Sequence, residues 1–189
     1  SDGLSYEQAQ SVLDGSGAIS PEIDNAIRTL DDLARRVRAD RARRGALDLE
    51  IPEARVVLDE RGHPVDILRR ERLESHRLIE DFMVLANEVV AADMEARGID
   101  VLYRVHEPPS RERADELREL LGRIGQNRLP GRTSLTPRDL QQLLEAVRGR
   151  PEAALVSTVV LRSLAKARYD PENLGHFGLG SLAYLHFTS

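Results

Sequence analysis

The segment from Leu73 to Arg97 constrains the fold most, because its spacing is helical and it is apolar on nearly every side. On a helical wheel of about 100° per residue, the apolar side chains cover one broad arc. These residues are Leu78, Ile79, Phe82, Met83, Leu85, Ala86, Val89 and Val90. We expect this to be the longest helix, to end at Gly98 and to be buried, and we expect a narrow solvated arc. The residues of that arc are Arg77, Asp81 and Glu88.

A stripe of polar residues crosses the same helix, with His76, Glu80 and Asn87 within roughly 40° of one another on the wheel. Buried polar groups need partners. The three side chains can bond to neighbouring backbone or to an arginine, or they can face a channel and bind a ligand, and both alternatives stay open. His76 and Glu80 also have the spacing of metal ligands, but no third ligand accompanies them, so we expect no metal here.

A second helix signal begins at Ser20, a good N-cap, which Pro21 and Glu22 follow. Apolar residues recur at helical spacing until Gly45, where we expect the helix to end. Its second half carries the arginines Arg35, Arg36, Arg38, Arg41, Arg43 and Arg44. These arginines are typical of a solvated helix end that suits the helix dipole, and an RNA-facing patch is the alternative.

The remaining segments predict short helices and short strands. We expect helices over 6–13, 110–122, 136–148 and 151–167, from their N-cap residues and their apolar spacing. Alternating residues predict strands on both sides of a turn at 61–63 and over 100–106, and residues 46–51 also alternate. The chain is therefore predicted to be one α+β domain, rich in helix, with a long buried central helix and a small antiparallel sheet.

Composition excludes several classes of protein. The sequence has no cysteine, which excludes a disulfide framework and favours a reducing cytoplasm. No apolar run is long enough to span a membrane, and no secretory signal is visible at the first residues, so we expect no membrane partner. The net charge of −5 argues against a surface that wraps nucleic acid all round, but it leaves room for a local basic groove.

The last residues carry the most specific motif. The segment GHFGL (175–179), followed by a tyrosine at 184 and by HFTS (186–189), resembles the core of the RNB domain of the ribonuclease II and ribonuclease R family. RGALDLEIPEA (44–54), HRLIEDFMVLAN (76–87) and RVHEPPS (104–110) resemble further segments of that domain, in the same order. The resemblance covers nearly the whole chain, and it is strongest to bacterial ribonuclease R.

The resemblance implies a processive exoribonuclease that hydrolyses single-stranded RNA from its 3′ end with Mg²⁺ and releases nucleoside 5′-monophosphates. In the family the HFTS motif continues into an arginine-containing segment, and a cluster of metal-binding aspartates lies upstream. We therefore expect residues 1–189 to be part of an RNB domain, truncated at both ends, with its catalytic groups and metal ligands outside the chain. The fragment alone is expected to be inactive, and the parent enzyme to be monomeric. The alternative is a non-catalytic RNB-derived module that binds RNA or a protein.

Several residues acquire roles through the resemblance. Glu80 aligns with an acidic residue that the family places near the sugar of the 3′-terminal nucleotide. The other RNA-binding candidates are Asn87, His176, Tyr184, Thr188 and Ser189. Where ribonuclease R-like proteins have an aromatic residue that stacks on a base, this sequence has Leu49.

Two further patterns have simpler interpretations. The glycines Gly175, Gly178 and Gly180 favour close packing over a phosphate loop. Three aspartates at 24, 31 and 32 lie along one predicted helix, and adjacent aspartates on a helix point about 100° apart, so we reject them as a metal site.

Overall fold

The computed structural model describes residues 3–17, 19–49, 54–69, 72–126, 128–132 and 134–188. Along the chain the helices are α1 (Tyr6–Leu13), α2 (Pro21–Arg44), α3 (Glu74–Ala96), α4 (Arg111–Arg123), α5 (Pro137–Val147) and α6 (Ala153–Ser163). The strands are β1 (Ala54–Leu58), β2 (Pro64–Arg69), β3 (Tyr103–Val105) and β4 (Arg168–Asp170), and a 3₁₀ turn, η1, spans Phe177–Leu179. The fold is thus helix-rich α+β, as the sequence predicts.

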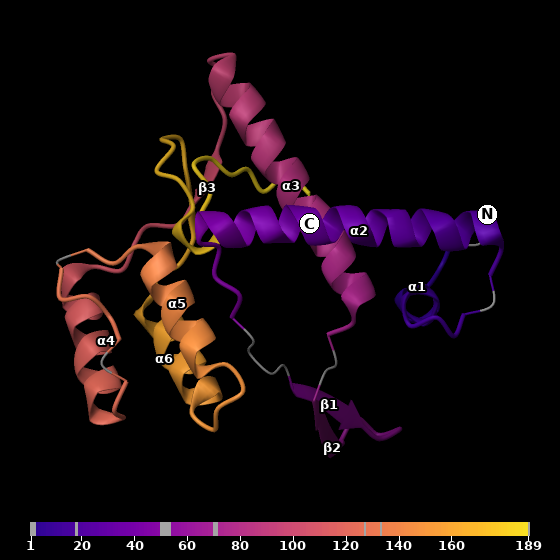
Figure 1. The fold of residues 1–189 in the computed structure, drawn as a ribbon, viewed down its shortest axis with the longest axis horizontal. Helices are drawn as coiled ribbons and strands as arrows, with labels where there is room; N and C mark the ends of the chain where they lie inside the picture. The colour runs from indigo at the N-terminus through magenta and orange to yellow at the C-terminus, as the bar shows by residue number, and fades with distance from the viewer. Residues whose placement is uncertain are drawn as a thin grey trace.

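The two long helices α2 and α3 cross one another at the centre of the molecule (Figure 1). The predicted ends of α2 are confirmed. The Ser20 hydroxyl accepts from the Ile23 N–H at 3.4 Å, and Gly45 ends the helix with a left-handed φ of 99°. α2 has 24 residues and α3 has 23, so the expectation that α3 is the longest helix is wrong by one residue.

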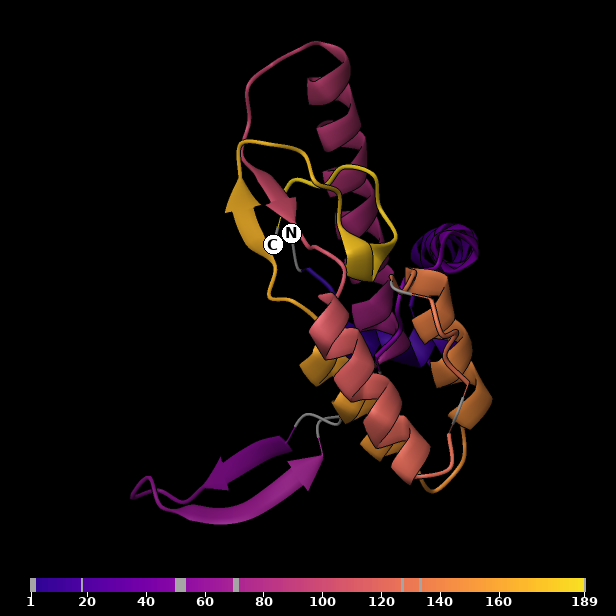
Figure 2. The same cartoon turned by 90° about the vertical axis from the view of Figure 1, so that its left-hand side faces the viewer.

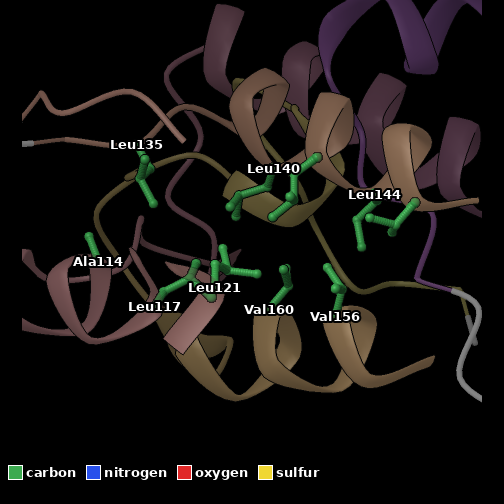
Figure 3. Close-up of a cluster of buried hydrophobic side chains, with 10 residues drawn as sticks. Ala114, Leu117, Leu121, Leu135, Leu140, Leu144, Val156 and Val160 are labelled. Carbon is green, nitrogen blue, oxygen red and sulfur yellow. The ribbon is translucent and has the colours of Figure 1, made fainter. Parts of the chain in front are cut away.

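Helices α4, α5 and α6 form a separate group at one end of the molecule, with their own apolar core (Figures 1 and 3). This core consists of buried alanine, leucine and valine side chains. Its members are Ala114, Leu117, Leu121, Leu135, Leu140, Leu143, Leu144, Val147, Val156 and Val160. The N-caps Ser110 and Thr136 are where the sequence predicts them, and each hydroxyl accepts a backbone N–H at 3.3 Å.

The described strands form two antiparallel pairs. β1 and β2 make a hairpin that extends away from the helices, with its turn at the predicted residues 61–63 (Figures 1 and 2). β3 pairs with β4, which lies on the far side of α4–α6 in sequence. The prediction that α6 continues to residue 167 is wrong, because it ends at Ser163 and residues 168–170 instead pair with β3.

The buried face of α3 differs from the predicted one. Its buried residues are Ser75, Leu78, Asp81, Val84, Asn87 and Ala91. Ile79 and Val89, which the wheel places in the core, are 42% and 58% exposed. Asp81, expected in solvent, is 4% exposed. The wheel ranks faces by apolar content, whereas α1, α2 and the C-terminal segment together decide which residues of α3 are covered.

A second apolar cluster joins α3 to β3 and to the C-terminal segment. It contains Ala91, Tyr103, Val105, Ala183 and Leu185. The 3₁₀ turn η1 belongs to the same C-terminal segment, and its Phe177 packs against the α4–α6 core. Among the helices of the described residues, none is both long and apolar enough to cross a membrane.

Candidate functional site

The C-terminal segment 175–188 is bound to β3 and α3 through its backbone. The Arg104 N–H donates to the Tyr184 carbonyl at 2.8 Å, and the His106 N–H donates to the Gly175 carbonyl at 3.0 Å. The Phe177 N–H donates to the His106 carbonyl at 2.7 Å. The segment that carries the GHFGL and HFTS motifs is therefore held as an irregular layer over β3, although it contains little regular structure of its own.

Asn87 is the hydrogen-bonding centre of this layer. It is 1% exposed, and its amide NH₂ donates to the Tyr184 hydroxyl at 2.9 Å and to the Thr188 carbonyl at 3.3 Å. Its carbonyl oxygen accepts from the Phe187 N–H at 3.2 Å, and from the Thr188 N–H and hydroxyl at 2.9 and 3.1 Å. One amide thereby satisfies groups from three residues of the C-terminal segment, so the structure favours the internal-bonding alternative for Asn87.

The glycines of the motif pack closely against other parts of the chain. A Cβ at Gly178 would lie 2.8 Å from His106 Nδ1, and the Gly178 N–H donates to that nitrogen at 3.1 Å. Gly180 has a left-handed φ of 58°, and a Cβ there would lie 3.0 Å from the Arg44 carbonyl at the end of α2. The close-packing interpretation is confirmed for these two positions, where backbone and imidazole occupy the space of a side chain.

Two histidines meet where this layer contacts the end of β3. The rings of His106 and His176 are 5.0 Å apart between centroids, and the His176 ring is 5.3 Å from that of Tyr184. Burial, followed by the nearby His106, lowers the pKa of His176 from 6.5 to about 4, and burial also lowers the pKa of His106. Both imidazoles are therefore neutral near pH 7. The Nδ1 of His176 accepts from the Leu179 N–H at 3.3 Å, which caps η1.

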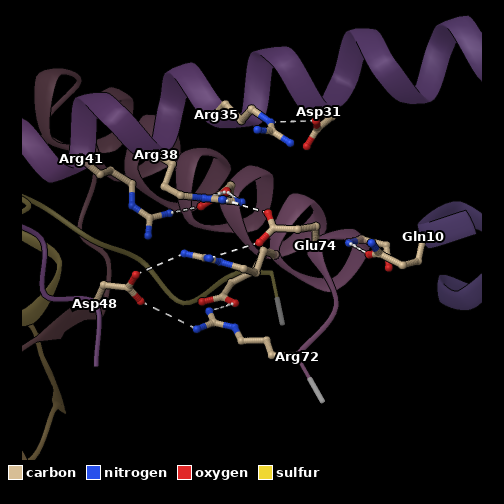
Figure 4. A network of polar contacts seen from close by, with 12 residues as sticks. Gln10, Asp31, Arg35, Arg38, Arg41, Asp48, Arg72 and Glu74 are labelled. Carbon is tan, nitrogen blue, oxygen red and sulfur yellow. Dashed lines mark hydrogen bonds and ion pairs between the residues drawn. The ribbon is translucent and has the colours of Figure 1, made fainter. Parts of the chain in front are cut away.

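Glu80 lies two turns before Asn87 on α3, roughly 10 Å away along the axis at 1.5 Å per residue. Its side chain is 47% exposed, and its Oε2 pairs with the Arg72 guanidinium. Arg72 is also 3.9 Å from Asp48, which in turn accepts from Arg77 at 3.2 Å. Asp48 and Arg72 precede and follow the β1–β2 hairpin, and Figure 4 shows them facing each other. Ion pairs thus join the base of the hairpin to the surface around Glu80.

Behind this surface, arginines of α2 bond to acidic residues of α3 (Figure 4). Arg38 and Arg41 hold the two carboxylate oxygens of Asp81 at 2.8 and 2.9 Å, and Arg44 bonds to Glu88 at 2.9 Å. The Asp81 side chain is 5% exposed. The expectation of a solvated arginine-rich end of α2 is thus wrong for Arg38 and Arg41, which neutralise Asp81 between the two helices, whereas Arg44 stays exposed while it bonds to Glu88.

The structure brings together some of the predicted site residues. Asn87, Tyr184 and Thr188 are directly bonded, and His176 contacts the Tyr184 ring. Glu80 lies apart from them and faces Arg72, and Ser189 lies outside the described residues. Leu49 is partly buried against the α4–α6 core. Sequence reasoning missed a further set of polar and aromatic residues near these groups, which comprises Asp48, Arg72, Arg104, His106, Tyr169 and His186.

The described residues do not fit a divalent metal ion. Proteins bind Mg²⁺ through one or two carboxylates, together with waters and substrate phosphates, so a site needs carboxylates that are not already paired. No group of three or more potential ligands occurs within the described ranges. Four acidic residues on and beside α3, Asp48, Glu80, Asp81 and Glu88, all face arginines. No step that uses a metal can be derived from these side chains.

Comparison with known proteins places this geometry in a family. The RNB domain family matches residues 1–189. Ribonuclease R of Aquifex aeolicus is 40% identical over 98% of this chain and 27% of the relative, and ribonuclease R of Escherichia coli is 36% identical over 98% and 23%. The structure of Mycoplasma genitalium RNase R in complex with ribose-methylated single-stranded RNA superposes with a TM-score of 0.93 at 30% identity, covering 98% of this chain and 29% of that one. The chain thus spans about a quarter of the length of the curated relatives. Its sequence, from the first residue to the HFTS motif, belongs to the RNB domain family.

Proposed function

We propose that this chain is a segment of a longer exoribonuclease that hydrolyses single-stranded RNA processively from the 3′ end and releases nucleoside 5′-monophosphates. The observation that carries the proposal is the combined match in sequence and fold to ribonuclease R, one structure of which holds single-stranded RNA. The reaction requires stabilisation of charge at the scissile phosphate. In this proposal Mg²⁺ supplies that stabilisation from ligands outside residues 1–189.

In the proposed enzyme this chain supplies part of the wall that holds RNA. The Asn87 amide fixes the backbone of residues 187 and 188, so it positions the HFTS motif against α3. The His176 ring packs against Tyr184, which precedes that motif, and Thr188 and Ser189 are its last two residues. A preorganised wall of this kind lowers the entropy that must be lost when RNA binds.

Glu80 has the chemistry to recognise ribose. A carboxylate accepts hydrogen bonds through two oxygens, and Arg72 bonds to Oε2. We propose that Oε1 accepts a bond from a ribose 2′-hydroxyl, the group that distinguishes RNA from DNA. Arg72 would keep the carboxylate oriented. The monomeric state of the enzyme and its place in the cytoplasm stay predictions.

The activity is tested by comparing the 189-residue chain with the full-length protein that contains it. We expect the full-length protein to release mononucleotides from single-stranded RNA with Mg²⁺, and a chelator to stop the release. The 189-residue chain alone should release none. Mononucleotides produced by that chain, and abolished by chelator, would contradict the division of catalytic groups. A full-length protein that binds RNA without cleaving it would favour the non-catalytic alternative.

The role of Glu80 is tested in the full-length protein with RNA and DNA of the same sequence. Glu80→Ala should weaken RNA binding by about 1.5–3 kcal/mol, the scale of a hydrogen bond to a charged group, and leave DNA binding nearly unchanged. Glu80→Gln keeps a carbonyl acceptor and should retain more of the discrimination. Equal losses on RNA and DNA, together with a lower melting temperature, would show that Glu80 only supports the fold through Arg72.

A further inference from the structure

The two faces of the β3–β4 pair differ in character. Side chains alternate between the faces of a strand, and residues directly opposite in an antiparallel pair share one face. Tyr103 and Val105 are buried in the cluster with α3. Arg104 therefore points to the other face, where its partner in the register is Tyr169. Tyr169 is 54% exposed. This small sheet presents an aromatic residue and a cation, side by side, to solvent.

The Tyr169 ring is held at two points even though it is exposed. The Arg104 guanidinium carbon lies 4.8 Å from the ring centroid, the geometry of a cation–π contact. At the other end, the Tyr169 hydroxyl shares a hydrogen bond of 3.0 Å with Nδ1 of His186. His186 belongs to the HFTS motif, whose next residue, Phe187, is 62% exposed. The orientation of the ring is thus fixed next to the segment that the Asn87 amide positions.

Arg104 also carries an uncompensated charge. Other arginines of this part of the chain have a carboxylate partner: Arg97 pairs with Asp93 at 3.0 Å, and Arg168 pairs with Glu107 at 3.1 Å. Within the described part of the chain no carboxylate pairs with the Arg104 guanidinium, whose contact is with the Tyr169 ring. Its N–H donors are therefore available to an anion that approaches this face.

We propose that Tyr169, Arg104 and His186 form a stacking site for a nucleobase of single-stranded RNA. The base would stack on the exposed ring of Tyr169, and Arg104 would donate to the neighbouring phosphate. The inference rests on the proposed function and adds a contact to it. RNA fits better than an apolar peptide because the site combines a flat, fixed aromatic surface with an unpaired cation, which match the base and the phosphate of one nucleotide. Stacking of this kind tolerates any base.

The test uses the 189-residue chain and a short single-stranded RNA that carries the fluorescent base 2-aminopurine. Stacking on tyrosine quenches this base, so the readout responds to the contact itself. Tyr169→Ala should weaken binding about 5- to 100-fold and abolish the quenching, from the known range for base stacking. Tyr169→Phe keeps the ring and should stay within about threefold of the original affinity, because it loses only the bond to His186. Arg104→Gln should lower the slope of log affinity against log salt by about 0.7, the loss of one phosphate contact on a single strand.

Tyr6→Ala is the matched control, since Tyr6 is also a partly exposed tyrosine but lies on α1, at the other end of the molecule (Figure 1). It should leave affinity and quenching unchanged. Melting temperatures of all variants show whether they fold. Folded Tyr169→Ala that binds and quenches like the original chain would overturn this site and leave the proposed function intact. No binding of RNA by the original chain would overturn both the site and the RNA-holding role of this segment.

Discussion

Replacing Asn87 by alanine should destabilise the protein strongly, although the residue is a single neutral amide. The substitution removes bonds to Tyr184, Thr188 and Phe187. The Tyr184 hydroxyl is the most buried of these groups, and leaving it without a partner costs about 1–3 kcal/mol. The groups of Thr188 and Phe187 are nearer solvent, where water replaces part of what is lost. We expect a total loss of about 2–4 kcal/mol.

The assay is thermal unfolding of the original chain, Asn87→Ala, Tyr184→Phe and the double variant. At about 2–4 °C per kcal/mol for a chain of this size, Asn87→Ala should lower the melting temperature by roughly 5–15 °C. Tyr184→Phe removes the hydroxyl but keeps the buried ring, and should cost only about 1 kcal/mol. The double variant should be close to Asn87→Ala alone, because it no longer contains a buried hydroxyl without a partner.

Two results would refute this reasoning. An Asn87→Ala variant that melts within about 1 °C of the original chain would show that the hydrogen bonds of Asn87 together contribute less to the free energy of unfolding than one typical hydrogen bond does. Losses that simply add in the double variant would show that Asn87 and Tyr184 act independently, contrary to the 2.9 Å contact between them.

Three further predictions follow from buried groups. Asp81→Ala leaves Arg41 without its carboxylate and should lower the free energy of unfolding, measured with denaturant, by about 3–5 kcal/mol. Asp93→Ala removes an exposed ion pair and should lower it by less than about 1 kcal/mol. Equal losses would contradict a buried ion-pair layer. Gly178→Ala places a methyl group 2.8 Å from a buried imidazole nitrogen and should lower the melting temperature, and an unchanged melting temperature would show that this contact relaxes freely. Folding lowers the pKa of His176 from 6.5 to about 4, so on acidification the unfolded chain takes up a proton at this residue at a higher pH than the folded chain does. The free energy of unfolding should therefore fall as pH decreases from about 6.5 to 4, and His176→Asn should reduce that fall. An identical pH profile for this variant would show that other groups cause the effect.

Local signals predicted the ends of most helices and the strand that contains β3, but not β4. Ser20, Ser110 and Thr136 cap helices because their hydroxyls can accept from the first turn whatever surrounds them. β4 has only three residues, too few to show an alternation of apolar and polar side chains, and it is extended because its backbone pairs with β3. Sequence reasoning extended α6 through residues 164–167, which precede β4. No local signal indicates that the helix must end there so that the following residues can pair with β3.

In the candidate site, too, local features could be predicted from the sequence, whereas pairings between distant residues could not. The polar stripe singled out Asn87 correctly as a residue that needs partners, and the crowded glycines indicated close packing. The partner of Glu80, Arg72, could not be identified, because the pairing depends on where the hairpin joins α3. Likewise, Arg104 and Tyr169 meet only through the β3–β4 register. What could not be predicted is thus what depends on contacts between distant segments.

The β3–β4 pairing also affects the order of folding during synthesis. The α4–α6 group lies between these strands in sequence and has its own core, so it can fold as soon as residues up to 163 have left the ribosome. β3 must wait for residues 168–170, and the buried side chains of Tyr103 and Val105 must wait for Ala183 and Leu185 to cover them. Once the inserted helices have folded, they replace a long flexible loop between the strands and reduce the entropy lost when the strands meet. The nascent chain therefore completes its central layer after the α4–α6 group, with the emergence of the residues that carry its most specific motif.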